Sequence, residues 1–175
     1  MENTMVSIVK YILTNLGAFG LSDSKELQLI ERPKVKLPDG SKRLTVLGLR
    51  TLPDNTKGVP FGNLLASGVQ GERFLTLVEI ECKCRAPDPG MDYFWNDVRR
   101  LRDKAYNALA GPNRGGLVVP RFDWTYRENP IPAGEIWFEV DPGRSTPTED
   151  LLEDPADAAN KSIFLTYNVH WWQPV

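Results

Sequence analysis

Apolar residues recur every three or four positions in residues 5–16, which is the spacing of one face of an α-helix. The members of this stripe are Met5, Ile8, Val9, Ile12, Leu13 and Leu16. Asn3 or Thr4 can cap the start of the helix, because their side-chain oxygens can accept hydrogen bonds from free backbone N–H groups, and Gly17 can end it. The pattern predicts an amphipathic first helix.

A second stripe with the same spacing runs through residues 92–110. Its members are Phe94, Val98, Leu101, Ala105 and Leu109. Asp92 is a natural cap for the start, and Gly111 followed by Pro112 ends the helix, since glycine adopts left-handed backbone angles and proline cannot continue a helix. The pattern predicts a second amphipathic helix.

Alternation of apolar and polar residues indicates strands elsewhere. Residues 27–37 and 43–52 alternate in this way and flank the turn sequence Pro-Asp-Gly-Ser at 38–41, which predicts a β-hairpin. Residues 72–85 predict a long strand with Cys82 and Cys84 on the same face as Val78 and Ile80.

Three more strands are expected at residues 117–127, 135–140 and 162–172. In the first, one predicted face holds Val118, Phe122, Trp124 and Tyr126, and the other holds Arg121, Asp123, Thr125 and Arg127. We expect a single α+β domain in which a mainly antiparallel sheet packs against two helices.

Two long segments are predicted to be loops. Residues 53–71 contain four glycines and two prolines around Phe61, Leu64 and Leu65, which is too broken for a regular element. Residues 141–160 form an acidic loop with at most one helical turn near positions 151 and 152. Five carboxylates lie between positions 149 and 157, those of Glu149, Asp150, Glu153, Asp154 and Asp157.

Composition excludes several classes of protein. The 175 residues are 41% hydrophobic and 25% charged, which argues against wholesale disorder. A formal net charge of -2 argues against general nucleic-acid affinity, and no stretch approaches the roughly 20 apolar residues that span a bilayer. The two cysteines do not form a disulfide scaffold, so a reducing compartment is expected.

Candidates for catalysis or metal binding are weak. The single histidine, His170, lies in an aromatic strand with no serine or cysteine nucleophile and supporting acid around it. Cys82, Cys84 and His170 offer three zinc ligands but lack the usual spacing of cysteine pairs and a fourth ligand. The glycines of residues 58–71 match no phosphate-binding motif. We expect no enzyme activity, no cofactor and no metal.

Charge on the second predicted helix has three interpretations. Arg99, Arg100, Arg102 and Lys104 can form a solvated face with an Arg99–Asp103 ion pair. They can instead meet the acidic loop of a neighbouring subunit, because patches of opposite charge steer assembly. Contact with DNA is the third choice. Of the adjacent Trp171 and Trp172, one ring is expected in the core and the other outside, as an interface anchor or a cover for a strand edge.

The chain as a whole resembles the tail terminator proteins of long-tailed phages. The resemblance lies in the order and length of the elements: a helix at 5–16, a hairpin at 27–52, a strand at 72–85, a helix at 92–110 and closing strands through 162–172. It covers nearly the entire chain but includes no signature of fixed residues. The acidic loop departs from the family in its length.

The resemblance implies a virion protein that is not an enzyme, assembled in the cytoplasm of the host bacterium. It implies a homo-hexameric ring on the last ring of the tail tube, which stops polymerisation, faces the head–tail connector protein and, where the tail is contractile, meets the tail sheath. Genomic DNA would pass through the ring without specific binding. The long segments 53–71 and 141–160 are the ones expected to contact neighbours.

Two other classes of function stay open. A head–tail connector or tail-completion protein would share the size, the ring and the lack of catalysis. A monomeric domain that binds a small ligand or a metal is the alternative outside assembly.

Overall fold

The computed structural model describes residues 2–29, 37–53, 71–87, 94–140, 148–153 and 159–174. The elements follow in the order α1 (Glu2–Thr14), η1 (Leu16–Phe19), η2 (Ser24–Glu26), β1 (Leu27–Leu29), β2 (Lys42–Pro53), β3 (Gly71–Arg85), α2 (Phe94–Ala110), β4 (Val118–Asp123), β5 (Ile131–Phe138), β6 (Thr148–Glu153) and β7 (Asn160–Pro174).

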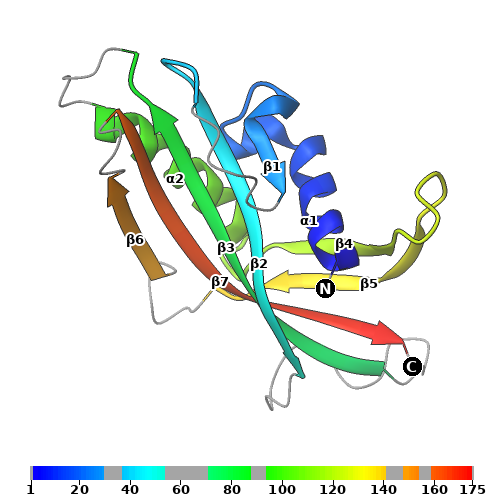
Figure 1. The fold of residues 1–175 in the computed structure, drawn as a ribbon. Helices are drawn as coiled ribbons and strands as arrows, with labels where there is room; N and C mark the ends of the chain where they lie inside the picture. The colour runs from blue at the N-terminus through cyan, green and yellow to red at the C-terminus, as the bar shows by residue number, and fades with distance from the viewer. Residues whose placement is uncertain are drawn as a thin grey trace.

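The described strands form one curled sheet (Figure 1). Six of them lie in the order β1-β2-β3-β7-β5-β4, and β6 pairs with the first half of β7. Only β1 and β2 run parallel; every other described pair is antiparallel. The prediction of an α+β domain with a mainly antiparallel sheet and two helices is confirmed.

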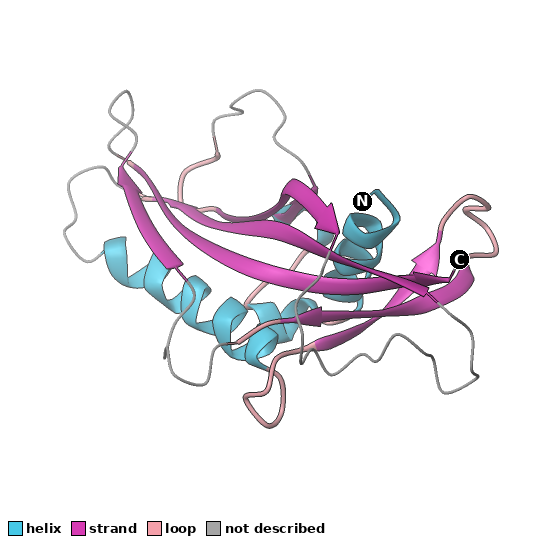
Figure 2. Cartoon of the chain, turned by 90° about the horizontal axis from the view of Figure 1, so that it is seen from below, coloured by secondary structure: helices cyan, strands magenta, loops and turns pink. Residues whose placement is uncertain are grey.

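Both helices pack on one face of this sheet, and α2 runs along it (Figure 2). The predicted stripes supply the contacts, because period 3.6 in a helix and period 2 in a strand each gather apolar side chains on one side. Buried residues of the helices are Met5, Ile8, Ile12, Val98, Leu101, Ala105 and Leu109. Facing them are Val78, Ile80, Cys82 and Cys84 of β3 and Ile163, Leu165, Tyr167, Val169 and Trp171 of β7. Burial of each large aliphatic side chain contributes about 1.5–3 kcal/mol.

The predicted hairpin of residues 27–52 is wrong. β1 lies parallel to β2, with Leu27 opposite Leu44, whereas a hairpin needs antiparallel strands. The turn itself forms just before β2, since the backbone N–H of Ser41 donates to the carbonyl of Pro38 at 3.1 Å. The antiparallel neighbour of β2 is β3.

The predicted caps of the first helix serve another purpose. α1 already begins at Glu2, so Asn3 and Thr4 lie inside it. The Asn3 amide donates to Asp123 at 3.1 Å, and the Thr4 hydroxyl accepts from Arg121 Nε at 3.1 Å. Both side chains therefore fasten α1 to β4. The second helix ends as predicted, at Ala110, and Gly111 follows with φ +71.

The predicted faces of β4 are reversed. Val119 and Arg121 are buried, whereas Val118 is 45% exposed and Tyr126, beyond the strand, is 68% exposed. The pairing of β4 with β5 shifts register between Pro120 and Phe122. Burial alternates regularly from Val118 to Arg121, so the inward face of the strand is the one that carries Val119 and Arg121.

The acidic segment contains a strand where a loop with a helical turn was expected. β6 pairs with β7, with Glu153 opposite Lys161 and Thr148 opposite Thr166. β5 covers β7 only from Phe138 opposite Val169 onward, so β6 supplies hydrogen-bond partners to an edge that would otherwise be open. Asp154 and Asp157 lie outside the described residues.

Candidate functional site

The outer face of α2 carries the predicted arginines in two different settings. Arg99 and Arg100 are exposed, and Arg100 Nη1 lies 3.9 Å from a carboxylate oxygen of Asp97. The Arg102 side chain is only 20% exposed, and its Nε lies 3.2 Å from Asp103. Asp103 therefore pairs with Arg102 instead of the predicted Arg99. Because exposed ion pairs contribute only about 0–1 kcal/mol, the pair with Asp97 does not prevent Arg100 from binding another partner.

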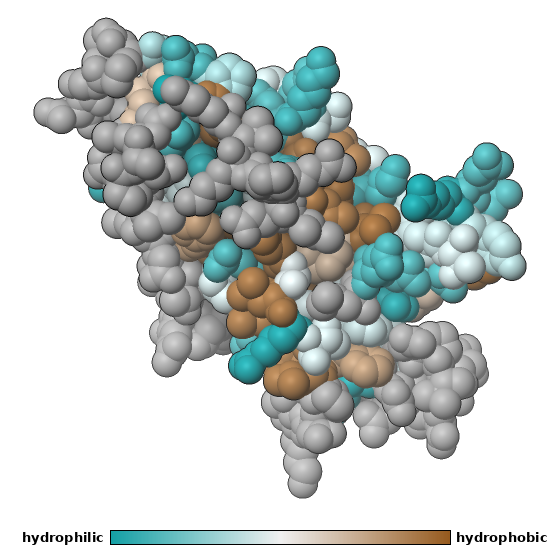
Figure 3. All heavy atoms as spheres, viewed as in Figure 1, coloured by the Kyte–Doolittle hydropathy of each residue, from teal (hydrophilic) through white to brown (hydrophobic). Residues whose placement is uncertain are grey.

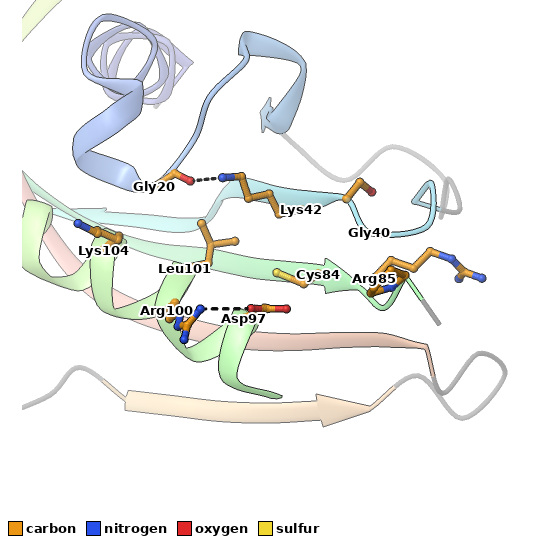
Figure 4. A pocket seen from close by; sticks show the side chains of 11 residues that line it. Gly20, Gly40, Lys42, Cys84, Arg85, Asp97, Arg100, Leu101 and Lys104 are labelled. Carbon is orange, nitrogen blue, oxygen red and sulfur yellow. Dashed lines mark hydrogen bonds and ion pairs between the residues drawn. The ribbon is translucent and has the colours of Figure 1, made fainter. Parts of the chain in front are cut away.

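A basic pocket of about 500 Å³ borders this helix face (Figure 4). It lies where α2 passes η1 and the paired ends of β2 and β3. Its lining residues are Gly20, Gly40, Ser41, Lys42, Cys84, Arg85, Pro87, Asp97, Arg100, Leu101 and Lys104. Four of these are cations and one is an acid, so the pocket attracts negative charge.

Backbone and side-chain acceptors hold two of the four cations. Lys42 Nζ donates to the carbonyl of Gly20 at 2.5 Å, and Arg85 Nε donates to Asp39 at 2.6 Å. Arg85 is buried, while the Asp39 side chain is 69% exposed. The strand ends thus fix part of the positive charge, and α2 adds Arg100 and Lys104. Sequence reasoning named Arg100 but missed Lys42 and Arg85, which meet it only through packing.

Cys84 lines the same pocket but offers no reactive thiolate. Burial raises its pKa to about 12, and the nearby Asp97 carboxylate adds to the shift. At neutral pH the group is a thiol, which is a poor nucleophile. The chemistry of the pocket is therefore attraction of an anion.

The acidic strand β6 lies on the other side of α2 from this pocket. The pocket opens toward β2 and η1, whereas β6 lies beyond β3 and β7 (Figure 4). Its sequence contains Glu149, Asp150 and Glu153, and its second edge pairs with no other described strand. One subunit thus presents a basic hollow and an acidic strand in different places.

The far half of β2 exposes apolar surface. Leu49, which lies at an irregularity in the pairing with β3 between Gly48 and Arg50, is 50% exposed, and Leu52, beyond it, is 45% exposed. Figure 3 shows apolar atoms over this half of β2, and Figure 1 shows the strand continuing past the helices. The predicted contact residues Phe61, Leu64 and Leu65 lie outside the described residues, in the connection from β2 to β3.

Neither neighbouring tryptophan of β7 is the exposed anchor that was expected. Trp171 and Trp172 are each 3% exposed. The Trp172 ring packs against β5, where a Cβ on Gly134 would lie 3.3 Å from its Cε3 atom. Gly134 leaves room for the ring, so β5, a neighbouring strand of the same sheet, covers Trp172.

The remaining candidates are structural. His170 stacks on Trp137 with ring centres 5.1 Å apart, and its Nε2 lies 3.1 Å from Glu139. The residue opposite His170 on β3 is Leu75, which lies seven residues from Cys82. His170 is therefore not a neighbour of the cysteine pair. Within the described ranges, no three His, Cys, Asp or Glu residues gather in a way that could hold a metal ion.

Comparison of the sequence with models of known protein families gives no match, and neither does comparison with curated proteins. Neither helix in the described part of the chain is long and apolar enough to cross a membrane.

Proposed function

We propose that the protein is a structural subunit of a phage tail, which forms a hexameric ring on the tail tube, ends tube polymerisation and joins the tail to the head connector. The observation that carries this proposal is the separation of opposite charges on one subunit. The basic pocket and the Arg99 and Arg100 face lie on and beside α2, whereas the acidic strand β6 lies beyond β7.

Two different complementary surfaces favour a head-to-tail contact between copies. Such a contact closes into a ring when the rotation between neighbours divides a full turn. Opposite charges steer the encounter and fix its register, and they suppress wrong pairings. The exposed leucines of β2 supply apolar area for a contact with the neighbour or the tube.

Charge reversal tests the contact. Arg99→Glu and Arg100→Glu place negative charge opposite the acidic strand of the next copy, so we expect each to weaken ring formation. Lys25→Glu is the matched control, because it makes the same change at an exposed residue of η2 that does not line the pocket. Light scattering separates six copies of 19.7 kDa, about 118 kDa, from one.

Electron microscopy with assembled tail tubes completes the test. Density at one tube end supports the proposal, including for a protein that closes into a ring only on its tube. A monomer that leaves tubes uncapped overturns it. Binding to the portal instead of the tube would identify a head–tail connector. Normal rings from both reversed variants would refute the α2 contact while leaving the ring intact.

A further inference from the structure

A second pocket, of about 720 Å³, lies between the first turns of α1 and the end of β4. Its lining residues are Glu2, Asn3, Val6, Lys10, Arg121, Trp124, Thr125 and Arg127. None of them belongs to α2 or β6, so this pocket is separate from the surfaces of the proposed ring contact.

The central residue of this pocket is a buried, rigidly held arginine. Arg121 is 5% exposed, and its guanidinium carbon lies 4.4 Å from the ring centre of Trp171. Nε donates to the Thr4 hydroxyl at 3.1 Å, and Nη1 donates to the carbonyl of Ala133 at 3.2 Å. Two strands and a helix therefore fix the guanidinium.

The positive charge of Arg121 lacks a direct counter-charge. Both hydrogen-bond acceptors are neutral, and among the described residues Nη2 has no acceptor and no carboxylate lies within 4.0 Å of the guanidinium. Burial lowers the pKa of Arg121, and the more distant Asp123 opposes this effect. A buried cation without an adjacent anion is unfavourable, so binding of an anion here relieves a cost already present in the fold.

The carboxylate of Asp123, which acts on Arg121 from a distance, is engaged elsewhere. Asp123 accepts hydrogen bonds from the Thr125 hydroxyl at 2.6 Å, the Thr125 backbone N–H at 2.9 Å and the Asn3 amide at 3.1 Å. These bonds, led by that of the Thr125 hydroxyl, hold the pKa of Asp123 below its usual value. Asp123 thus bonds to Asn3 and Thr125, which both line the pocket, and makes no hydrogen bond to Nη2 of Arg121.

Two more cations line the pocket. Lys10 Nζ lies 5.7 Å from the ring centre of Trp124, whose indole N–H donates to the Ser7 hydroxyl at 3.0 Å. Arg127 is exposed at the rim. Three cations and an aromatic wall with only Glu2 as a lining acid make this a site for an anion.

We propose that this pocket binds a carboxylate group, which accepts from Nη2 of Arg121 and pairs with Lys10 and Arg127. A singly charged carboxylate suits the site better than phosphate, because Glu2 and Asp123 repel a dianion more strongly. The carboxylate comes either from an acidic side chain of a partner polypeptide or from a free small acid. The pocket volume of about 720 Å³ is large enough for an acidic side chain or for a free small acid.

Titration monitored by NMR tests the proposal. The indole N–H of Trp124, assigned with Trp124→Phe, reports on the pocket wall. The probes are acetate, the acidic hexapeptide TEDLLE, its amide counterpart TQNLLQ, and inorganic phosphate, all at equal ionic strength. We expect saturable shifts with acetate or TEDLLE and none with TQNLLQ. Acetate alone identifies a free acid as the source, and TEDLLE alone identifies a polypeptide.

Variants of the two less buried cations that line the pocket test binding without disturbing the fold. Lys10→Gln and Arg127→Gln remove charges without touching the buried Arg121, and we expect each to weaken binding about five-fold. Lys104→Gln, in the other pocket, is the matched control and should bind normally. Absence of a saturable shift with both acids, equal binding by TQNLLQ, or tighter binding of phosphate overturns the proposal. Binding of acetate or phosphate does not bear on ring formation, whereas binding of TEDLLE, the sequence of β6, would make this pocket an alternative contact for β6 of a neighbouring copy.

Discussion

A Cβ atom on Gly116 would lie 1.9 Å from the carbonyl oxygen of Phe138. Gly116 has φ +95, its N–H donates to Ala110 at 2.9 Å, and the next residue, Leu117, accepts from Phe138 N at 2.9 Å. The chain leaving α2 is thereby pressed against the end of β5, where only glycine fits.

Gly116→Ala should therefore lower the free energy of unfolding by about 2–4 kcal/mol, through backbone strain and displacement of β5. Urea denaturation measures the change. Gly115→Ala is the control, because its added Cβ meets nothing within 4 Å, and we expect a change below about 0.5 kcal/mol. Equal losses in the two variants would contradict the close approach.

The hydroxyl of Thr76 on β3 links two neighbouring strands, β2 and β7. It accepts from Trp171 Nε1 at 2.8 Å and shares a hydrogen bond with Thr51 at 2.9 Å. Thr76→Val leaves the buried indole N–H without a partner, so we expect a loss of about 1–3 kcal/mol in unfolding free energy. Thr76→Ser keeps the hydroxyl and should lose less. A valine variant as stable as the serine variant would show that the bond contributes nothing.

Asp123 should make the protein sensitive to acid. Its folded pKa lies below the ordinary value of 3.8, so its ionised form stabilises the fold above that pH. This stabilisation is lost as the pH falls through the folded pKa. Between pH 6 and pH 3 the melting temperature of the wild type should fall more than that of Asp123→Asn. Parallel melting curves across this range would argue against the role of the Thr125 and Asn3 bonds.

Both thiols should resist modification in the folded protein. Cys82 is 0% exposed and Cys84 is 5% exposed, and burial raises the pKa of Cys84 to about 12. At pH 8 we expect a thiol reagent to label neither residue within minutes. The same reagent should label two thiols per chain in urea, which serves as the control. Rapid labelling of the folded protein would show that the sheet around Cys82 and Cys84 of β3 opens readily.

The long strands and α2 could be predicted because their signals are local. Alternation along β3 and β7 placed Cys82 and Leu165 inside, and the stripe of α2 ended at its glycine as expected. The direction of β1 could not be predicted, because a strand alternates in the same way whether its neighbour runs parallel or antiparallel. β6 escaped prediction because charged residues are as typical of an edge strand as of a loop.

The candidate sites needed tertiary structure. Helical spacing predicted a solvated face for Arg99 and Arg100, and both are exposed. Only packing brings Lys42 into the same pocket as Arg100. Arg121 alternates with Asp123 and Arg127 in the sequence and was expected on the polar face. It instead shares the buried face of β4 with Val119 and stacks on Trp171. Local patterns do not contain that information.

The position of β7 also constrains how the chain folds during synthesis. β7 lies between β3 on one side and β5 and β6 on the other, yet it follows all of them in the sequence. Its partners in β3 lie far back along the chain, since Arg85 pairs with Asn160 and Gly71 with Pro174. Contacts between such distant residues form slowly. The ribosome therefore releases two partial sheets, β1–β2–β3 and β4–β5, which no described strand joins until β7 emerges.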